Sequence, residues 1–186
     1  MTAEETDVDV VDLLLAQHDR IRVLFREVEV SGDGTRKERF DELRRFLAVH
    51  ETAEEMIVHP LAKRQSDEGE AVARDRLAEE RESKELLARL DDMDVTDPEF
   101  RVRFAMLHEM VLHHAGNEER KEFPLLRQHV EPDELRRMAG AVRAAEKVAP
   151  TRPHPGVESP AAHLATGPLA SLVDRTRDAV RSALRE

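Results

Sequence analysis

The stretch HETAEEMIVHP, residues 50–60, and the stretch HAGNEERKEFP, residues 114–124, carry the same pattern of four residues. Both place His, Glu, Glu and Pro at identical offsets, as His50, Glu54, Glu55 and Pro60 in the first and His114, Glu118, Glu119 and Pro124 in the second. Little else matches between them, so the repeat is not general helical redundancy. Residues i and i+4 lie one turn apart on the same face of an α-helix. Each His–Glu pair is therefore predicted to bind an ion from one side.

Around both stretches, apolar residues recur at spacings of three, four and seven, which is typical of amphipathic helices. Asp97 followed by Pro98 is a helix-start signal. No segment of the sequence shows the alternating pattern of a β-strand. We predict helices over about residues 8–30, 35–66, 70–91, 98–129 and 132–149. The predicted fold class is all-α, an up-down-up-down four-helix bundle with additional C-terminal helices.

The composition changes near residue 150. Residues 150–168 read PTRPHPGVESPAAHLATGP and hold five of the nine prolines, which indicates an extended linker. Apolar residues then recur at helical spacing. The predicted domains are 1–149, the bundle with a fifth helix; 150–167, the linker; and 168–186, an amphipathic helix. We expect this last helix to pack against its own bundle before a second subunit, and the protein to be a monomer or homodimer.

The balance of charges and the lack of cysteine exclude several classes of function. The chain has 186 residues, with 40 acidic and 29 basic side chains and a formal charge of −11. Such a charge repels phosphate backbones and anionic lipids, so we expect neither nucleic acid nor a membrane as partner. Zero cysteines exclude disulfides, thiolate metal sites and cysteine nucleophiles. The acidic start of the chain resembles no signal peptide, and we expect a cytoplasmic protein.

The depth of the candidate donors in their helices can be compared using a rise of about 1.5 Å per residue. His18 lies about 18 Å before the end of its helix, and Glu80 about 18 Å into the third helix. His50 and His114 lie about 21 Å and about 24 Å into theirs. Antiparallel helices bring these residues to a common depth. A single inward His or a Glu pair has ordinary structural explanations, but several buried carboxylates together require compensation, for which a metal ion is the usual solution.

The residues just described resemble those of the hemerythrin-type HHE cation-binding domain, over about residues 8–145. Members of that family have a first-helix His followed by an acidic residue, here His18-Asp19, and two His-x-x-x-Glu motifs. The resemblance implies a non-haem di-iron centre with an oxo or hydroxo bridge inside a four-helix bundle. It also implies that Glu54 and Glu118 bridge the two irons, and that His18, His50 and His114 are terminal ligands.

The third helix departs from the family pattern. The family usually has a His where this chain reads EERESKELLARL, residues 79–90. With Leu86-Leu87 as the anchor, that position falls on Glu80, with Glu79 as the alternative. The predicted metal ligands are therefore His18, His50, Glu54, Glu80, His114 and Glu118. A shell this rich in carboxylates favours ferric iron and argues against reversible oxygen carriage. Oxygen and imidazole donors without sulfur suit iron or manganese, and zinc is an alternative.

The other histidines and one further carboxylate receive lower priority. We expect His59 to lie outside the site, and His108 at most to contact a ligand. Glu51 is a candidate extra ligand because it adjoins His50. The remaining histidines near helix ends or in the linker are expected to be solvated: His129, His154 and His163.

The pattern favours a hemerythrin-like di-iron protein that reacts with or senses dioxygen, hydrogen peroxide or nitric oxide. The alternative is an iron-binding protein that senses or stores iron without turnover, and a third option is a structural bundle that has lost its metal. Whether the protein is an enzyme stays open. The sequence indicates no flavin, haem or nicotinamide site, so any reductant is a separate protein or small molecule.

Overall fold

The computed structural model describes residues 8–148 and 168–183, and within these ranges every regular element is a helix. The predicted all-α class is confirmed. The helices are α1 (Val10–Val30), α2 (Asp33–Ala53), the π-helix η2 (Glu54–Val58), α3 (His59–Gln65), α4 (Asp67–Asp91), α5 (Pro98–Asn117), the π-helix η3 (Glu118–Glu122), α6 (Phe123–His129), α7 (Pro132–Val148) and α8 (Pro168–Ala183).

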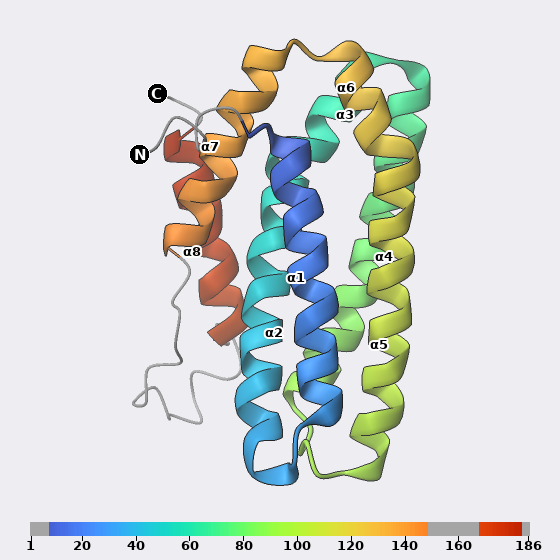
Figure 1. Cartoon of the computed structure of the whole chain (residues 1–186), viewed down its shortest axis with the longest axis vertical. Coiled ribbons are helices and arrows are strands. Elements are labelled where there is room, and N and C mark those ends of the chain that lie inside the picture. The colour runs from blue at the N-terminus through green and yellow to red at the C-terminus, as the bar shows by residue number, and fades with distance from the viewer. Residues whose placement is uncertain (1–7, 149–167, 184–186) are drawn as a thin grey trace.

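The four long helices α1, α2, α4 and α5 lie alongside one another, and the chain reverses direction from each to the next (Figure 1). The predicted helix over 35–66 is observed as the continuous run α2–η2–α3. The predicted helix over 98–129 is observed as the run α5–η3–α6. Each run thus contains a π-helical turn that the sequence pattern does not predict.

Side-chain caps begin three of these helices. The carboxylate of Asp9 accepts a hydrogen bond from the Asp12 N–H at 2.9 Å at the start of α1. Asp97 accepts one from the Glu99 N–H at 2.8 Å and precedes Pro98, as predicted for the start of α5. At the start of α4, Ser66 accepts from the Gly69 N–H at 3.0 Å. A Cβ on this glycine would lie 2.1 Å from the Ala62 carbonyl oxygen, so glycine permits the close approach of α3 and α4.

The apolar core is divided into two clusters along the helix axes. The first apolar cluster includes Leu14 and Leu126 and joins the start of α1 and the end of α2 to α3, α6, α7 and α8. The second apolar cluster includes Phe25, Phe40 and Phe104 and fills the end where α1 turns into α2. Buried polar residues lie between the two clusters. The fold therefore encloses a polar layer between two apolar regions.

The last two helices cover one side of the molecule. Helix α7 packs against α1 and α2, and α8 packs against α2 and α7 (Figure 1). The side chains of Thr176 and Val180 in α8 are buried. The expectation that the last helix packs against its own chain is confirmed. The predicted linker at 150–167 lies outside the described residues, and the division into domains stays a prediction.

Within residues 8–148 and 168–183, no helix combines the length and the apolar character that crossing a membrane requires.

Replacing Val180 by Ala should lower the free energy of unfolding by about 1–3 kcal/mol, because the side chain is 0% exposed and its loss leaves a void in the first apolar cluster. Chemical denaturation measures the difference. The control is Arg175→Ala, an exposed residue of the same helix, which should leave stability unchanged. Equal stability of the two variants would show that α8 does not contribute to the folded core.

Candidate metal centre

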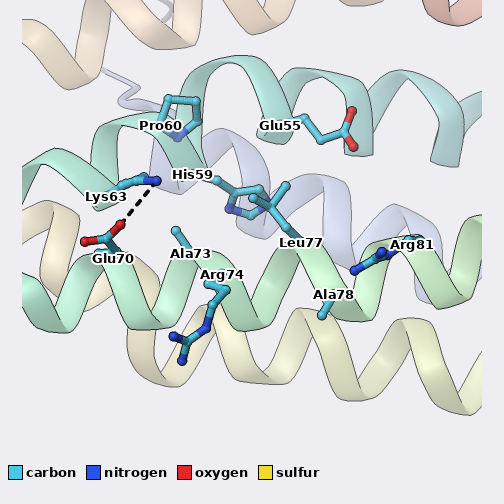
Figure 2. A pocket seen from close by; sticks show the side chains of 10 residues that line it. All are labelled: Glu55, His59, Pro60, Lys63, Glu70, Ala73, Arg74, Leu77, Ala78 and Arg81. Atoms are coloured by element: carbon cyan, nitrogen blue, oxygen red, sulfur yellow. Dashed lines mark ion pairs between the residues drawn. The ribbon is translucent and has the colours of Figure 1, made fainter.

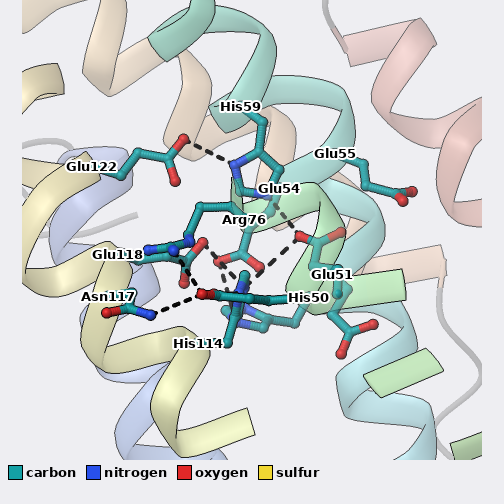
Figure 3. Close-up of polar contacts among 12 residues, drawn as sticks. His50, Glu51, Glu54, Glu55, His59, Arg76, His114, Asn117, Glu118 and Glu122 are labelled. Carbon is teal, nitrogen blue, oxygen red and sulfur yellow. Dashed lines mark hydrogen bonds and ion pairs between the residues drawn. The ribbon is translucent and has the colours of Figure 1, made fainter. Parts of the chain in front are cut away.

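All six predicted ligands lie together in the polar layer, and each is at most 5% exposed. We call this set the donor cluster: His18 from α1, His50 from α2, Glu54 at the start of η2, Glu80 from α4, His114 from α5 and Glu118 at the start of η3. Figure 3 shows side chains from several helices pointing toward a common centre. The placement agrees with the sequence analysis, while the role of these residues as metal ligands stays a prediction.

The histidine Nε2 atoms of the donor cluster face its carboxylates. His18 Nε2 lies 3.2 Å from Glu118 Oε2, and His114 Nε2 lies 3.4 Å from Glu118 Oε1. His50 Nε2 lies 3.3 Å from Glu54 Oε1. Glu118 therefore lies between imidazoles from α1 and α5. Within each motif the His and the Glu, one helical turn apart, also contact each other.

Two groups of ligand atoms within the donor cluster have the spacing of a metal site. His18, His50, Glu54 and Glu118 each offer an atom within 4.8 Å of the others, as do Glu54, Glu80 and His114. A third group with the same spacing joins Glu118 to two residues outside the predicted set, His59 and Glu122. Nitrogen and oxygen ligands of such ions lie at about 2.0–2.2 Å, so ligands of one ion are about 3–4 Å apart and small adjustments suffice. Glu54 belongs to the first two groups and Glu118 to the first and third, which is the arrangement that a bridging carboxylate requires.

Several atoms of the donor cluster are buried and lack a hydrogen-bond partner among the described residues. They are His18 Nε2, His114 Nε2 and both carboxylate oxygens of Glu54 and Glu118. Buried polar atoms normally have partners, and a buried ionised carboxylate without one is strongly unfavourable. A cation at the centre would satisfy all of these atoms at once. The residues present therefore fit a metal pair held by nitrogen and oxygen.

Each of the three imidazoles is oriented by an oxygen acceptor that faces its Nδ1 atom. The pairs are His18 Nδ1 with Glu119 Oε1 at 2.9 Å, His50 Nδ1 with Gln17 Oε1 at 2.7 Å, and His114 Nδ1 with Glu79 Oε2 at 3.1 Å. An Nδ1–H held by an oxygen acceptor leaves the Nε2 lone pair directed into the cluster, as metal-binding histidines require. Gln17 also donates to Glu146 of α7 at 2.8 Å, which fixes the amide in turn.

The structure distinguishes Glu80 from its neighbour Glu79. Glu80 is 1% exposed and lies within the donor cluster. Glu79 instead contacts His114 Nδ1 and accepts hydrogen bonds from Arg76 at 2.7 Å and from Asn117 at 2.9 Å. The register that places Glu80 inward thus agrees with the structure, and Glu79 acts on the cluster by orienting His114.

Both repeated motifs contain a π-turn at the same place. The His59 N–H donates to the Glu54 carbonyl, and the Phe123 N–H donates to the Glu118 carbonyl, so each bond joins residues five apart. A proline follows in each case, Pro60 and Pro124, and proline removes the N–H that an α-helix would use there. Single π-turns inside α-helices are frequent at functional sites.

The expectation that His59 lies outside the site is wrong. Its side chain is 1% exposed, with Nε2 2.7 Å from Glu80 Oε1 and Nδ1 2.9 Å from Glu122 Oε1. In an α-helix a residue five positions after Glu54 would be rotated from it by about 140°. The π-turn removes most of this rotation and directs His59 inward. The proline at position 60 is the sequence signal that could have revealed the turn.

Other candidates do not join the donor cluster. Glu51 is buried, lies 3.7 Å from Lys84 Nζ, and belongs to none of the groups with metal-site spacing in the described part of the chain. His108 stacks on Phe25 with ring centroids 4.4 Å apart and lies 2.8 Å from Glu29, away from the ligands. His129 is exposed as expected, whereas His154 and His163 lie outside the described residues.

Burial and mutual repulsion change the acidity of the carboxylates. Burial, together with the charge of Glu118, raises the pKa of Glu54 to about 7. Burial also raises the pKa of Glu51 to about 8. Burial alone would lower the pKa of His18, but the nearby carboxylates of Glu118 and Glu54 raise it to about 10. Without a cation, these three groups therefore keep their protons to a higher pH, whereas the neighbouring imidazoles outweigh burial and lower the pKa of Glu118 and Glu80.

A pocket of about 410 Å³ opens between α3 and α4, next to the donor cluster (Figure 2). His59 is part of its wall, so one imidazole ring separates the pocket from Glu80. The other lining residues are Glu55, Pro60, Lys63, Glu70, Ala73, Arg74, Leu77, Ala78 and Arg81. The pocket therefore borders the donor cluster at His59.

Comparison with known proteins gives one family and one relative. The model of the hemerythrin HHE cation binding domain matches residues 9–126. A curated protein named DNA nickase, from Nostoc sp. (strain PCC 7120 / SAG 25.82 / UTEX 2576), is 26% identical over 145 residues, which cover 77% of this chain and 41% of the relative. The chain thus spans about two fifths of the length of that relative. No solved structure matches the chain.

The midpoint temperature of unfolding of the metal-free protein should fall by at least about 5 °C between pH 6 and pH 9. In the folded protein the pKa is about 7 for Glu54 and about 8 for Glu51, above the usual 4.5. The stability that these protonated carboxyl groups contribute is fully present below pH 4.5 and is lost as the pH rises through the folded-state values. The raised pKa of His18 acts in the same direction, nearer pH 10. The measurement is thermal unfolding in chelator. Metal should reduce the slope, and a stability that increases over this range would contradict the assignment.

Proposed function

The chain belongs to the family of hemerythrin HHE cation-binding domains, and from this premise we propose that its donor cluster binds a pair of iron ions. The observation that carries the proposal is the set of buried oxygens and nitrogens that converge from separate helices and have no hydrogen bond within the described ranges. The four long helices α1, α2, α4 and α5 would form the up-down-up-down bundle around this pair.

The first two groups of donors indicate which residues would hold each iron. His18 and His50 would hold the first iron, while Glu80 and His114 would hold the second. Glu54 shares both groups and would bridge the pair. Glu118, which lies between His18 and His114, would be the second bridge. Carboxylate and imidazole donors without sulfur are compatible with iron, and the high share of carboxylates favours the ferric state.

We propose that the protein reacts with or senses dioxygen, hydrogen peroxide or nitric oxide. Two adjacent irons supply redox chemistry for such molecules when they are bound. The chain itself orients the imidazoles through Gln17, Glu79 and Glu119, and the two apolar clusters exclude bulk water above and below the layer. The pocket beside His59 offers a route for the small molecule. The alternative function is iron sensing or storage without turnover.

The name of the Nostoc relative describes that protein, and we do not extend its activity to this chain. A formal charge of −11 opposes approach to a phosphate backbone. The proposed partners are therefore small molecules, with no nucleic acid and no membrane surface.

The iron-loaded protein should hold about two irons per chain, and Glu118→Gln should lose both, because the substitution preserves volume but removes a charge shared between the two sites. Elemental analysis gives the stoichiometry. With no Trp or Tyr in the chain, ferric charge-transfer bands stand out in the near ultraviolet. The control is His129→Ala, an exposed residue near the end of α6, which should retain both irons. Trace metal in the wild-type protein after expression with ample iron, manganese and zinc would refute the proposal.

Filling the pocket should slow the reaction without removing iron. Leu77 is 41% exposed and lines the pocket, so Leu77→Trp should reduce the consumption of hydrogen peroxide or nitric oxide by the reduced protein several-fold while the iron content is unchanged. Electrode measurements record the rates. Val102→Trp, at a residue of α5 that is 62% exposed, is the matched control. Equal rates in both variants would exclude the pocket as the route, and an iron-loaded wild-type protein that consumes neither molecule would favour storage or sensing.

A further inference from the structure

The position of His59 repeats the arrangement of the three imidazoles in the donor cluster. In each of those three, Nδ1 faces an acceptor from another helix, and Nε2 faces a carboxylate of the cluster. In His59, Nδ1 lies 2.9 Å from Glu122 and Nε2 lies 2.7 Å from Glu80. His59 is therefore oriented toward a cation in the same way as the three histidines of the donor cluster.

The imidazoles also form two similar pairs. The rings of His18 and His50 lie edge to face, with centroids 5.1 Å apart and an interplanar angle of 81°. The rings of His59 and His114 lie edge to face as well, with centroids 6.4 Å apart and an angle of 83°. The first pair belongs to the donor group of the first iron. The second pair flanks Glu80, which belongs to the donor group of the second iron.

We propose that His59 is a further ligand of the second iron, beside Glu80 and His114, and that Glu122 is the residue that orients it. This inference rests on the proposed iron pair. It explains why the third helix can present Glu80 where the sequence resemblance leads one to expect a histidine. The missing imidazole comes from α3 instead and reaches the same place, since its Nε2 contacts the Glu80 carboxylate.

The second repeat shows that this position is built to face the centre. Phe123 follows Glu118 by five residues, as His59 follows Glu54, and it is placed by the equivalent π-turn. Its ring stacks on His18 with centroids 5.6 Å apart and an interplanar angle of 17°. One repeat thus covers a ligand with an apolar ring, whereas the other places a ring with a donor nitrogen at the corresponding point.

A purely structural role for His59 is the competing explanation, in which the ring only joins Glu80 to Glu122 by ion pairs. The two explanations differ in whether an imidazole at residue 80 can compensate for the loss of the imidazole at residue 59. A ligand can be supplied from residue 80, because that side chain already lies in the group with Glu54 and His114. An ion pair between residues 80 and 122 cannot be restored once residue 59 is apolar.

The test compares wild-type protein, His59→Phe and the double variant His59→Phe/Glu80→His. Phenylalanine is the residue that the second repeat has at this position, so the variant keeps a ring of similar size. Anaerobic titration of the metal-free proteins with Fe²⁺, and separately with Co²⁺, gives the stoichiometry and affinity. The visible spectrum of Co²⁺ reports the ligand set without any turnover.

Wild-type protein should bind two equivalents of Co²⁺, and His59→Phe should retain the first while the second weakens at least about a hundredfold. The double variant should recover the second equivalent. His59→Gln, which keeps polar contacts to Glu80 and Glu122, should lose the second equivalent as well. The control His108→Phe changes a histidine outside the donor cluster and should bind both equivalents with wild-type affinity.

Three results would overturn the assignment: an unchanged second affinity and Co²⁺ spectrum in His59→Phe, a second equivalent retained by His59→Gln, or a folded double variant that does not recover the loss. A wild-type protein that binds no metal would instead refute the proposed function itself. Failure of the further inference and failure of the iron pair are thus distinguished by the wild-type stoichiometry.

Discussion

Burying carboxylates that have no hydrogen-bond partner is the constraint on which this structure depends. Glu54 and Glu118 are 0% exposed, and among the described residues their oxygens have imidazole nitrogens at 3.2–3.4 Å but no hydrogen bond. Such an arrangement is unfavourable in an apolar interior unless a cation balances it. The division of the core follows from it, because the apolar side chains gather on either side of the polar layer. The acceptors behind each imidazole also follow, since they keep the nitrogen lone pairs directed inward.

Regular helical geometry explains which parts of this arrangement could be predicted from the sequence. His50 and Glu54 are four residues apart within an ordinary helix, so their common face can be read directly. The depth of His18 and Glu80 follows from counting residues along straight helices. Counting alone leaves Glu79 as the alternative to Glu80, and the choice of Glu80 rests on the family pattern with Leu86-Leu87 as the anchor. The all-α class follows from the apolar periodicity.

What the sequence could not show depends on departures from that regular geometry. His59 is misplaced by any reading that continues α2 with 3.6 residues per turn, because the π-turn changes the direction of every side chain that follows. The position of Glu51 could not be judged either, since its adjacency to His50 says nothing about whether its oxygens approach the ligands. The acceptors Gln17 and Glu122 give no signal of their own. Polar residues on an inward stripe can only be assigned after the facing helices are placed.

The two π-turns have a further consequence for how the chain tolerates changes in length. Each turn holds one residue more than an α-helix would, between a glutamate of the donor cluster and the proline that follows. Because the π-turn already absorbs that extra residue, deleting one residue there would let the helix close as an ordinary α-helix and leave the segment beyond it facing in nearly the same direction. A further inserted residue that no turn absorbs would instead rotate the segment beyond it by about 100°. In this fold, therefore, these two helical segments should tolerate the loss of one residue better than the gain of another.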